Sequence, residues 1–241
     1  MFILESIINM KSIHKSFGKQ DVLTDISLKV PRGEIYGLIG PSGSGKTTLV
    51  KMLIGLESPD SGTVEFKGSP LKAAAVYTSV GYMAQSDALY TELTAKENLN
   101  FFASLYSLKK KDREDRIRSV MKTVDLLAHL DKPVALYSGG MKRRLSLAIA
   151  LLHDPEVLIL DEPTVGIDPV LRKQIWEQFQ ELKGKGRTLL ITTHVMDEAE
   201  RCDRLGLLRN GTLLGSEEPS LIKEKYGVSS LEEVFLSTEV H

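Results

Sequence analysis

A glycine-rich segment carries the side chains best suited to hold a chain of phosphates. It reads Gly40-Pro41-Ser42-Gly43-Ser44-Gly45-Lys46-Thr47 and fits the pattern G-x-x-x-x-G-K-[ST]. Glycines let successive backbone N–H groups turn toward an anion, and Lys46 supplies a mobile cation for the β- and γ-phosphates. The Thr47 hydroxyl is a hard oxygen ligand for Mg²⁺. We predict a nucleotide site here and count the next residue, Thr48, as part of it.

Two acids at the end of an apolar run could complete such a site. Asp161 and Glu162 follow Val157-Leu158-Ile159-Leu160, and ligands of open α/β sheets bind at the carboxyl ends of the strands. Asp161 suits the Mg²⁺ shell, and Glu162, which points elsewhere, can act as general base toward an attacking water. Two acids at a strand end can also serve solubility alone, and the phosphate segment is what favours the catalytic interpretation.

Two further polar side chains follow predicted strands. His194 comes after Leu189-Leu190-Ile191-Thr192-Thr193, where it could contact the γ-phosphate and hold the water. Gln85 follows Val80-Gly81-Tyr82-Met83, and its amide could touch Mg²⁺ or water. A histidine at such a place can equally be an ordinary surface or core residue, so the residues alone leave its role open.

The elements that must position these side chains begin with a set of strands. Apolar runs rich in β-branched residues predict strands at residues 7–10, 25–30, 35–39, 80–83, 157–160 and 189–193. The runs that end before the phosphate segment, before the two acids and before His194 are apolar almost throughout, which is typical of a buried parallel sheet. Near the end of the chain, Asn210-Gly211 between two apolar runs predicts a hairpin.

The middle of the chain has a helical pattern. Thr94-Ala95-Lys96-Glu97 is a capping box that predicts the start of a helix. A second helix is predicted by apolar residues that recur at helical spacing, namely Ile117, Val120, Met121, Val124 and Leu127. A third helix is expected after Gly140. The sequence therefore predicts a helical block inserted into an α/β domain.

The composition is typical of a globular chain. Of the 241 residues, 42% are hydrophobic and 26% are charged, and 31 basic against 32 acidic residues give a formal net charge of -1. This balance argues against a protein that coats nucleic acid by charge alone. No apolar run approaches the ~18 residues of a membrane helix, and the first residues lack the basic region of a signal peptide. The single Cys202 excludes an internal disulfide framework and fits a reducing compartment.

A further segment gives the sequence a family resemblance. Tyr137-Ser138-Gly139-Gly140-Met141-Lys142-Arg143-Arg144-Leu145 resembles the signature sequence of ABC transporters. It occurs, in family order, with the phosphate segment (Walker A), Gln85 (Q-loop), Asp161-Glu162 (Walker B and catalytic acid), Gly166-Ile167-Asp168-Pro169 (D-loop) and His194 (H-switch). The chain thus resembles the nucleotide-binding subunit of an ABC transporter over about residues 7 to 215. Tyr137, Met141 and Gly166-Ile167 depart from the commonest family residues without removing a charged catalytic group.

The resemblance implies a fold and a domain organisation. The fold class is α/β, a P-loop NTPase whose RecA-like core has a mostly parallel sheet plus antiparallel strands, with an inserted α-helical subdomain. A single ABC ATPase domain spans residues 1–241. Its parts are an ATP-binding core at residues 1–88 and 154–215, a helical signature subdomain at residues 89–153 and a C-terminal tail at residues 216–241.

It also implies ligands and roles. The ligands are ATP and Mg²⁺, with Glu162 and His194 catalytic and Thr47, Gln85 and Asp161 around the metal. Phe17 matches the aromatic residue that stacks on adenine, although it can also be an ordinary apolar strand end. The nucleotide would further contact Gly40, Pro41, Ser42, Gly43, Ser44, Gly45, Lys46, Thr47, Thr48 and Gln85.

The signature segment has a physical interpretation of its own. Ser138 can cap the helix that follows, and Gly139 and Gly140 leave its N-terminus bare for a second anion. One chain cannot easily aim both anion sites at one γ-phosphate. The resemblance implies a dimer with a second copy of the subunit, or with a related subunit, in which each signature closes on the partner's ATP and Asp168 lies near the interface. We interpret Lys142-Arg143-Arg144 as a solvated basic face and expect no nucleic acid partner.

A combination of four segments is similar to the ABC-2 branch, which includes many bacterial exporters. The segments are Tyr-Ser-Gly-Gly-Met, Gly-Ile-Asp-Pro, Thr193-His194-Val195-Met196-Asp197-Glu198-Ala199-Glu200 and Leu231-Glu232-Glu233-Val234-Phe235-Leu236. This implies ATP-driven transport, in the direction of export, through separate membrane permease subunits at the cytoplasmic face of the cell membrane. A soluble ABC ATPase that acts on ribosomes or DNA is the alternative. A P-loop kinase or GTPase would leave Ser138-Gly139-Gly140 and His194 unexplained.

Overall fold

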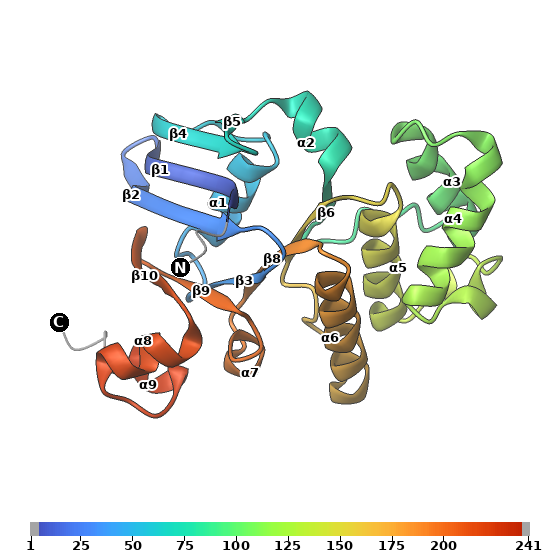
Figure 1. Ribbon diagram of the computed structural model, residues 1–241. Helices are drawn as coiled ribbons and strands as arrows, with labels where there is room; N and C mark the ends of the chain where they lie inside the picture. The colour runs from blue at the N-terminus through green and yellow to red at the C-terminus, as the bar shows by residue number, and fades with distance from the viewer. Residues whose placement is uncertain (1–4, 238–241) are drawn as a thin grey trace. The chain divides into compact units, whose positions relative to one another are not determined.

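The computed structural model describes residues 5–237, which form two compact units (Figure 1). One unit comprises the chain up to Ala73 and from Thr188 onward, and the other comprises residues 74–187. Parallel strands, antiparallel strands and a block of helices are all present, so the expected α/β class is confirmed. The expected absence of a signal peptide concerns residues 1–4, which lie outside the described residues.

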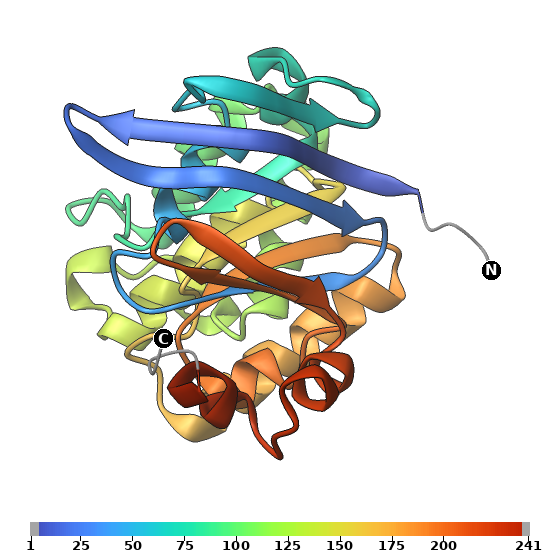
Figure 2. The same ribbon diagram turned by 90° about the vertical axis from the view of Figure 1, so that its left-hand side faces the viewer.

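The first unit contains an antiparallel sheet with the strand order β2-β1-β4-β5. Its strands are β1 (Ser6–Phe17), β2 (Gln20–Pro31), β4 (Ser61–Phe66) and β5 (Ser69–Pro70). Figure 2 shows the long strands β1 and β2 side by side, in dark and lighter blue. Sequence patterns predicted the first part of β1 and the second half of β2. They predicted neither β4 nor β5, because only Phe66 of β4 is fully buried and β5 has two exposed residues.

A second set of strands in this unit carries the phosphate segment. β3 (Ile35–Ile39) pairs in parallel with β8 (Thr188–Thr193) on one side and with β9 (Arg204–Arg209) on the other. Every residue of β3 and β8 is buried, as their continuous apolar runs predicted. β9 pairs antiparallel with β10 (Thr212–Glu217) through a turn in which Asn210 and Gly211 both have positive φ, which confirms the hairpin.

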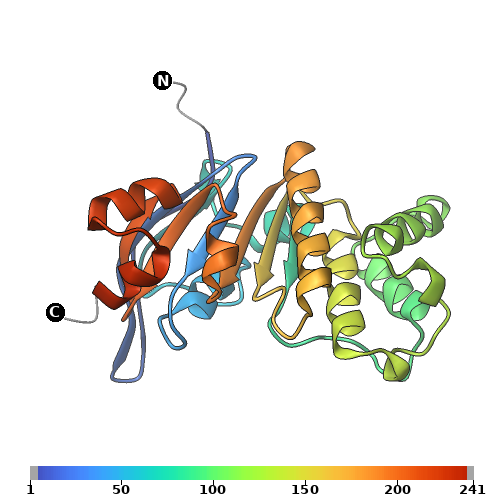
Figure 3. The same cartoon turned by 90° about the horizontal axis from the view of Figure 1, so that it is seen from below.

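In the part of this unit that the structure describes, four helices accompany these strands. They are α1 (Lys46–Leu53), α7 (Met196–Ala199), α8 (Pro219–Tyr226) and α9 (Leu231–Ser237). α8 begins with a proline and is followed by Gly227 in the left-handed conformation, the usual start and stop residues of a helix. The helices α8 and α9 lie in the segment expected to form a C-terminal tail, and Figure 3 shows them side by side.

The second unit has two parallel strands and a group of helices. β6 (Val80–Met83) pairs with β7 (Val157–Asp161), and both coincide with predicted strands. The helices are α2 (Ala73–Ser79), α3 (Ala95–Leu105), α4 (Lys110–Thr123), α5 (Gly139–Leu151) and α6 (Pro169–Gly184), with 3₁₀ turns at Leu127–His129 and Val134–Leu136. Figure 3 shows α3, α4 and α5 packed beside one another. The predicted capping box at Thr94 and Glu97 is present in full.

The second helix is shorter than its apolar pattern predicted. α4 ends at Thr123, and Leu127 lies in a separate 3₁₀ turn with 40% of its surface exposed. Asp125 has a φ of 53°, and the N–H groups of Leu126 and Asp125 bond to the carbonyls of Met121 and Lys122. This is a Schellman ending, which glycine or asparagine usually signals. An aspartate in that place gave no such signal.

A glycine in β6 allows this strand to approach α5 closely. A Cβ on Gly81 would overlap the carbonyl oxygen of Ala150 and lie 2.8 Å from side-chain atoms of Leu158 and Pro155. We expect Gly81→Ala to lower the free energy of unfolding by about 1–3 kcal/mol, because overpacked cores must shift. The control is Gly184→Ala at the end of α6, where a Cβ meets no described atom within 4 Å. Urea unfolding of the two variants checks this, and equal midpoints would contradict it.

Candidate functional site

The phosphate segment forms a loop between β3 and α1 that closes around its own lysine. Lys46 is buried, and its Nζ donates hydrogen bonds to the carbonyls of Gly40 (2.7 Å) and Pro41 (2.9 Å). The N–H of Ser44 bonds back to the Pro41 carbonyl at 3.2 Å. The loop therefore has a defined shape with a cation at its centre.

Two of the loop's glycines are required by geometry. A Cβ on Gly40 would overlap the Leu208 carbonyl oxygen and lie 2.7 Å from Ser44 Oγ. Gly45 has a φ of 104°, and a Cβ there would lie 2.6 Å from Leu23 Cδ2. Side chains larger than hydrogen would therefore displace the loop from the strands that hold it.

The loop fits an anion in two respects. Within residues 5–237, no side chain caps the N-terminus of α1, so its first N–H groups and its positive dipole end are presented to a ligand. The buried Ser44 Oγ has no hydrogen-bond partner among the described residues. Phosphate oxygens are the acceptors that such groups need.

His194 lies at the same edge of the strands as the phosphate loop. Ile39 and Thr193 are paired residues of β3 and β8, so Gly40 and His194 leave the two strands side by side. The Thr193 hydroxyl donates to Glu198 (2.7 Å) and accepts from the Val195 N–H (3.0 Å). These two bonds fix the turn that carries the exposed His194.

Phe17 ends β1, at the hairpin with β2, and is 50% exposed. The Lys15 ammonium lies 5.2 Å from the centre of its ring. A hydrogen bond to the Glu57 carboxylate raises the pKa of Lys15 above its ordinary value. The ring is thus held by a cation while much of it stays open for stacking.

We expect Phe17→Ala to weaken ATP binding about tenfold, because stacking of a base on an aromatic ring contributes roughly 1–3 kcal/mol. Binding of inorganic tripolyphosphate, which has no base, should not change. Calorimetry with both ligands checks this, and Phe17→Trp is the control that keeps a stacking surface. Equal losses for both ligands would show that the substitution disturbs the phosphate loop instead.

The other predicted site residues lie in the second unit. Asp161 is the last residue of β7 and is buried, and Glu162 follows it. Gln85 Nε2 donates a hydrogen bond to Glu162 Oε2 at 3.0 Å. Glu162 has a φ of 49°, a conformation that costs a residue other than glycine of order 1–3 kcal/mol and that concentrates at functional sites. The hydrogen bond from Gln85 thus places the predicted Q-loop amide in direct contact with Glu162, the predicted catalytic acid.

We predicted that Lys142-Arg143-Arg144 form a solvated basic face. This prediction is wrong for Arg143 and Arg144, which lie in α5. Arg143 is buried, and its guanidinium donates to the carbonyls of Ala84, Gln85, Asp161 and Glu162. The side chain of Arg144 is 14% exposed and bonds to backbone carbonyls after α4. A signal was present in the sequence, because Arg143 shares a helix face with Leu147 and Ala150, four and seven residues on.

The signature segment is arranged as predicted. The Ser138 hydroxyl accepts from the Met141 N–H at 3.2 Å and caps α5, whose first residues are Gly139 and Gly140. Tyr137, which departs from the family's usual residue, is buried and donates to the His129 carbonyl at 2.7 Å. Burial raises the pKa of Tyr137 to about 12, so the phenol stays protonated as a donor at neutral pH.

Asp168 has a local structural partner. Its carboxylate accepts from the Leu171 N–H at 3.0 Å and caps α6, which begins with Pro169. The residue itself is exposed. A cap of this kind fixes the start of α6. Because Asp168 is exposed as well, the cap is compatible with the interface role that the resemblance implies.

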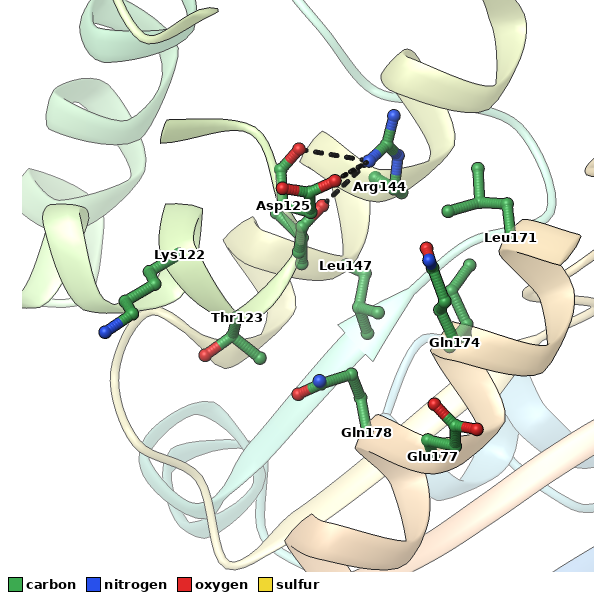
Figure 4. Close-up of a pocket in the computed structure, with 11 residues that line it drawn as sticks. Lys122, Thr123, Asp125, Arg144, Leu147, Leu171, Gln174, Glu177 and Gln178 are labelled. Atoms are coloured by element: carbon green, nitrogen blue, oxygen red, sulfur yellow. Dashed lines mark hydrogen bonds and ion pairs between the residues drawn. The ribbon is translucent and has the colours of Figure 1, made fainter. Parts of the chain in front are cut away.

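The second unit also contains a pocket of about 270 Å³. It is lined by the end of α4 and by residues of α5 and α6, with Arg144 turned toward Asp125 at its rim (Figure 4). None of the predicted site residues lines it. We assign it no part in the chemistry.

Comparison with known proteins supplies the family. The family described as ABC transporter matches residues 23–165. The chain is 42% identical over 229 residues to the Nod factor export ATP-binding protein I of Bradyrhizobium diazoefficiens, an alignment that covers 93% of this chain and 75% of that protein.

Solved structures agree. An ATP binding subunit of an ABC transporter has a TM-score of 0.87 at 32% identity and covers 96% of this chain and 99% of its own. The cbiO1 protein from Clostridium perfringens, part of the ABC transporter complex cbiONQ, has a TM-score of 0.83 at 26% identity and covers 98% of this chain and 96% of its own. Both likenesses confirm the P-loop NTPase fold.

Within residues 5–237, no helix combines the length and the apolar character needed to cross a bilayer. The family match and the identity over most of the chain favour an ABC ATPase over a P-loop kinase or GTPase as the interpretation of the phosphate loop. The chain belongs to the ABC transporter family, as an ATP-binding and ATP-hydrolysing subunit of a transporter.

Proposed function

We propose that this subunit powers export through separate membrane permease subunits, at the cytoplasmic face of the membrane. The observation that carries this proposal is the 42% identity, over 93% of the chain, to a protein named for export. The motif variants of the ABC-2 branch point the same way.

Within the site, we assign the roles by chemistry. The loop at residues 40–48 and Lys46 bind the phosphates, Phe17 stacks on adenine, and His194 contacts the γ-phosphate. Glu162 takes a proton from the attacking water, and its contact with Gln85 supports this role, because an amide that donates to one carboxylate oxygen holds the other in a set direction.

The residues predicted around Mg²⁺ fit that ion chemically. A hydroxyl from Thr47, an amide oxygen from Gln85 and a carboxylate from Asp161 are all hard oxygen donors, which Mg²⁺ prefers. When bound, the ion neutralises charge on the β- and γ-phosphates. Thr47 stands in the first turn of α1, and Asp161 ends β7 with its side chain buried.

We propose a dimer as the working unit. Ser138 caps α5 through a single N–H, and two glycines follow, so further N–H groups at this helix N-terminus can meet a second anion. A γ-phosphate bound in one subunit and met by the signature of its partner would favour the closed dimer. Hydrolysis removes that contact, so the dimer opens and passes the change to the permeases.

The test is purification of the tagged, full-length chain from detergent-solubilised membranes of its own host. We expect an integral membrane subunit with about six apolar segments of some 20 residues to co-purify. An untagged strain is the control for adventitious binding. Recovery of ribosomes or DNA in place of a hydrophobic subunit would overturn the proposal in favour of a soluble ABC ATPase.

A further inference from the structure

We propose that Arg143 is a positioning residue for ATP hydrolysis. Its guanidinium fixes the main chain on both sides of Glu162 and of Gln85, and so holds the catalytic carboxylate against the Q-loop amide. The inference rests on the proposed role of Glu162 as general base, and it gives a role to a residue of the signature segment that the assignments above leave without one.

The contacts with Glu162 carry the first step. Arg143 Nη2 donates to the carbonyl oxygens of Asp161 and Glu162, both at 2.6 Å. These two carbonyls belong to the peptide groups that flank the Glu162 Cα. Because the orientations of the two flanking peptide planes set φ and ψ, one nitrogen atom determines the backbone conformation of Glu162. That conformation, with a φ of 49°, is sparsely populated unless the surroundings hold it.

The same arrangement occurs at the Q-loop. Arg143 Nη1 donates to the carbonyl oxygens of Ala84 (2.7 Å) and Gln85 (2.8 Å), which flank the Gln85 Cα. The two main-chain segments fixed in this way hold Gln85 Nε2 at 3.0 Å from Glu162 Oε2. A shift of either main chain would separate them.

Charge and burial show why an arginine is needed. The guanidinium has four terminal N–H bonds in one plane, and four carbonyls accept from them. A lysine offers three donors from a single point and cannot span both pairs. Arg143 is only 6% exposed, and the nearby Asp87 carboxylate, 3.5 Å from Nη1 and bonded to Ser146 Oγ, supplies the opposite charge.

A neighbouring residue provides a matched control. Arg144 is the next residue of α5, and its Nη1 also donates to two backbone carbonyls, those of Val124 (3.2 Å) and Asp125 (3.1 Å). Those carbonyls follow α4, where Figure 4 shows Arg144 turned toward Asp125, and they belong to neither the Gln85 nor the Glu162 segment. Arg144→Gln therefore removes the same kind of anchor from the same helix, away from the catalytic acid.

The experiment measures kcat for phosphate release and Kd for ATP in Arg143→Gln, Arg143→Lys and Arg144→Gln. We expect kcat to fall about 10–100-fold in both Arg143 variants, the scale of a misplaced catalytic group. ATP affinity should stay within about twofold, since the phosphate loop is unchanged. Arg144→Gln should keep its kcat. Arg143→Lys retains the charge and most of the volume, so it gives a readout even if Arg143→Gln folds poorly.

Two readouts separate positioning from a general structural role. Combined with Glu162→Gln, Arg143→Gln should cause no further loss of kcat, because it acts through the group already removed. In Arg143→Ala, millimolar ethylguanidinium should restore activity several-fold, whereas ethylammonium should not.

The outcomes distinguish the inference from the proposed function. Wild-type kcat in Arg143→Lys, or a double variant slower than Glu162→Gln by the full single-variant factor, would overturn the role of Arg143 and leave that of Glu162 standing. Normal turnover by Glu162→Gln alone would overturn the assignment of the base, and the inference with it.

Discussion

Replacing Glu162 with glutamine should slow ATP hydrolysis by ~10²–10⁴-fold, the range that general base catalysis contributes. Glutamine has nearly the same shape and can still accept from Gln85 Nε2 through its amide oxygen, so the local structure should survive. What disappears is the carboxylate that, in the function we propose, takes a proton from water. ATP should still bind, because the phosphate loop is intact.

The measurement is steady-state phosphate release together with calorimetric ATP binding. Glu177→Gln on the exposed side of α6 is the matched control, since it removes one carboxylate from the same unit and should leave the rate unchanged. Normal turnover in Glu162→Gln would reassign the general base. Loss of both binding and turnover would indicate that the substitution disturbs the fold.

The strands around the site could be predicted because their signal is local. β3 and β6 begin and end at the predicted residues, and the runs before Glu162 and His194 are strands buried throughout. A strand covered on both faces is apolar without interruption, so the pattern needs no knowledge of its neighbours. The same holds for the caps at Thr94 and Ser138, whose partners lie three residues on.

Arg143 shows that patterns over a few neighbouring residues do not predict contacts between distant parts of the chain. Its acceptors lie 59 and 58 residues away at Ala84 and Gln85, and 18 and 19 residues away at Asp161 and Glu162. Only the tertiary fold brings these carbonyls to one side chain. In the sequence, Arg143 stands between two other basic residues and matches the common pattern of a solvated helix face. The helix periodicity was informative, because it places Arg143 on the buried face with Leu147.

The left-handed residues were missed for a related reason. Asp125 and Glu162 both have positive φ, although neither is glycine or asparagine. At Asp125 the consequence is an early end to α4. At Glu162 it is a turn directly after β7 that sets the direction of the predicted catalytic carboxylate. Contacts from other segments hold such conformations, so the residue types alone gave no warning.

The second large effect is expected at Lys46. Lys46→Ala should weaken ATP binding about 100-fold, because hydrogen bonds to charged groups contribute roughly 1.5–3 kcal/mol each and every 1.4 kcal/mol is a factor of ten. The lysine also bonds to the carbonyls of Gly40 and Pro41, so its removal loosens the loop as well. Calorimetry with ATP measures the loss.

Lys51→Ala is the control that separates the effect of overall charge on ATP affinity from the effect of the position of Lys46 in the loop. Lys51 lies on the same helix α1 but is exposed, so its removal lowers the net charge equally without changing the interior of the loop. ATP affinity should then stay close to that of the unaltered chain, since an exposed cation outside the loop is screened by salt. Equal losses in the two variants would mean that overall charge attracts the nucleotide. A loss confined to Lys46→Ala requires a cation at the centre of the loop, where backbone carbonyls already hold it in place.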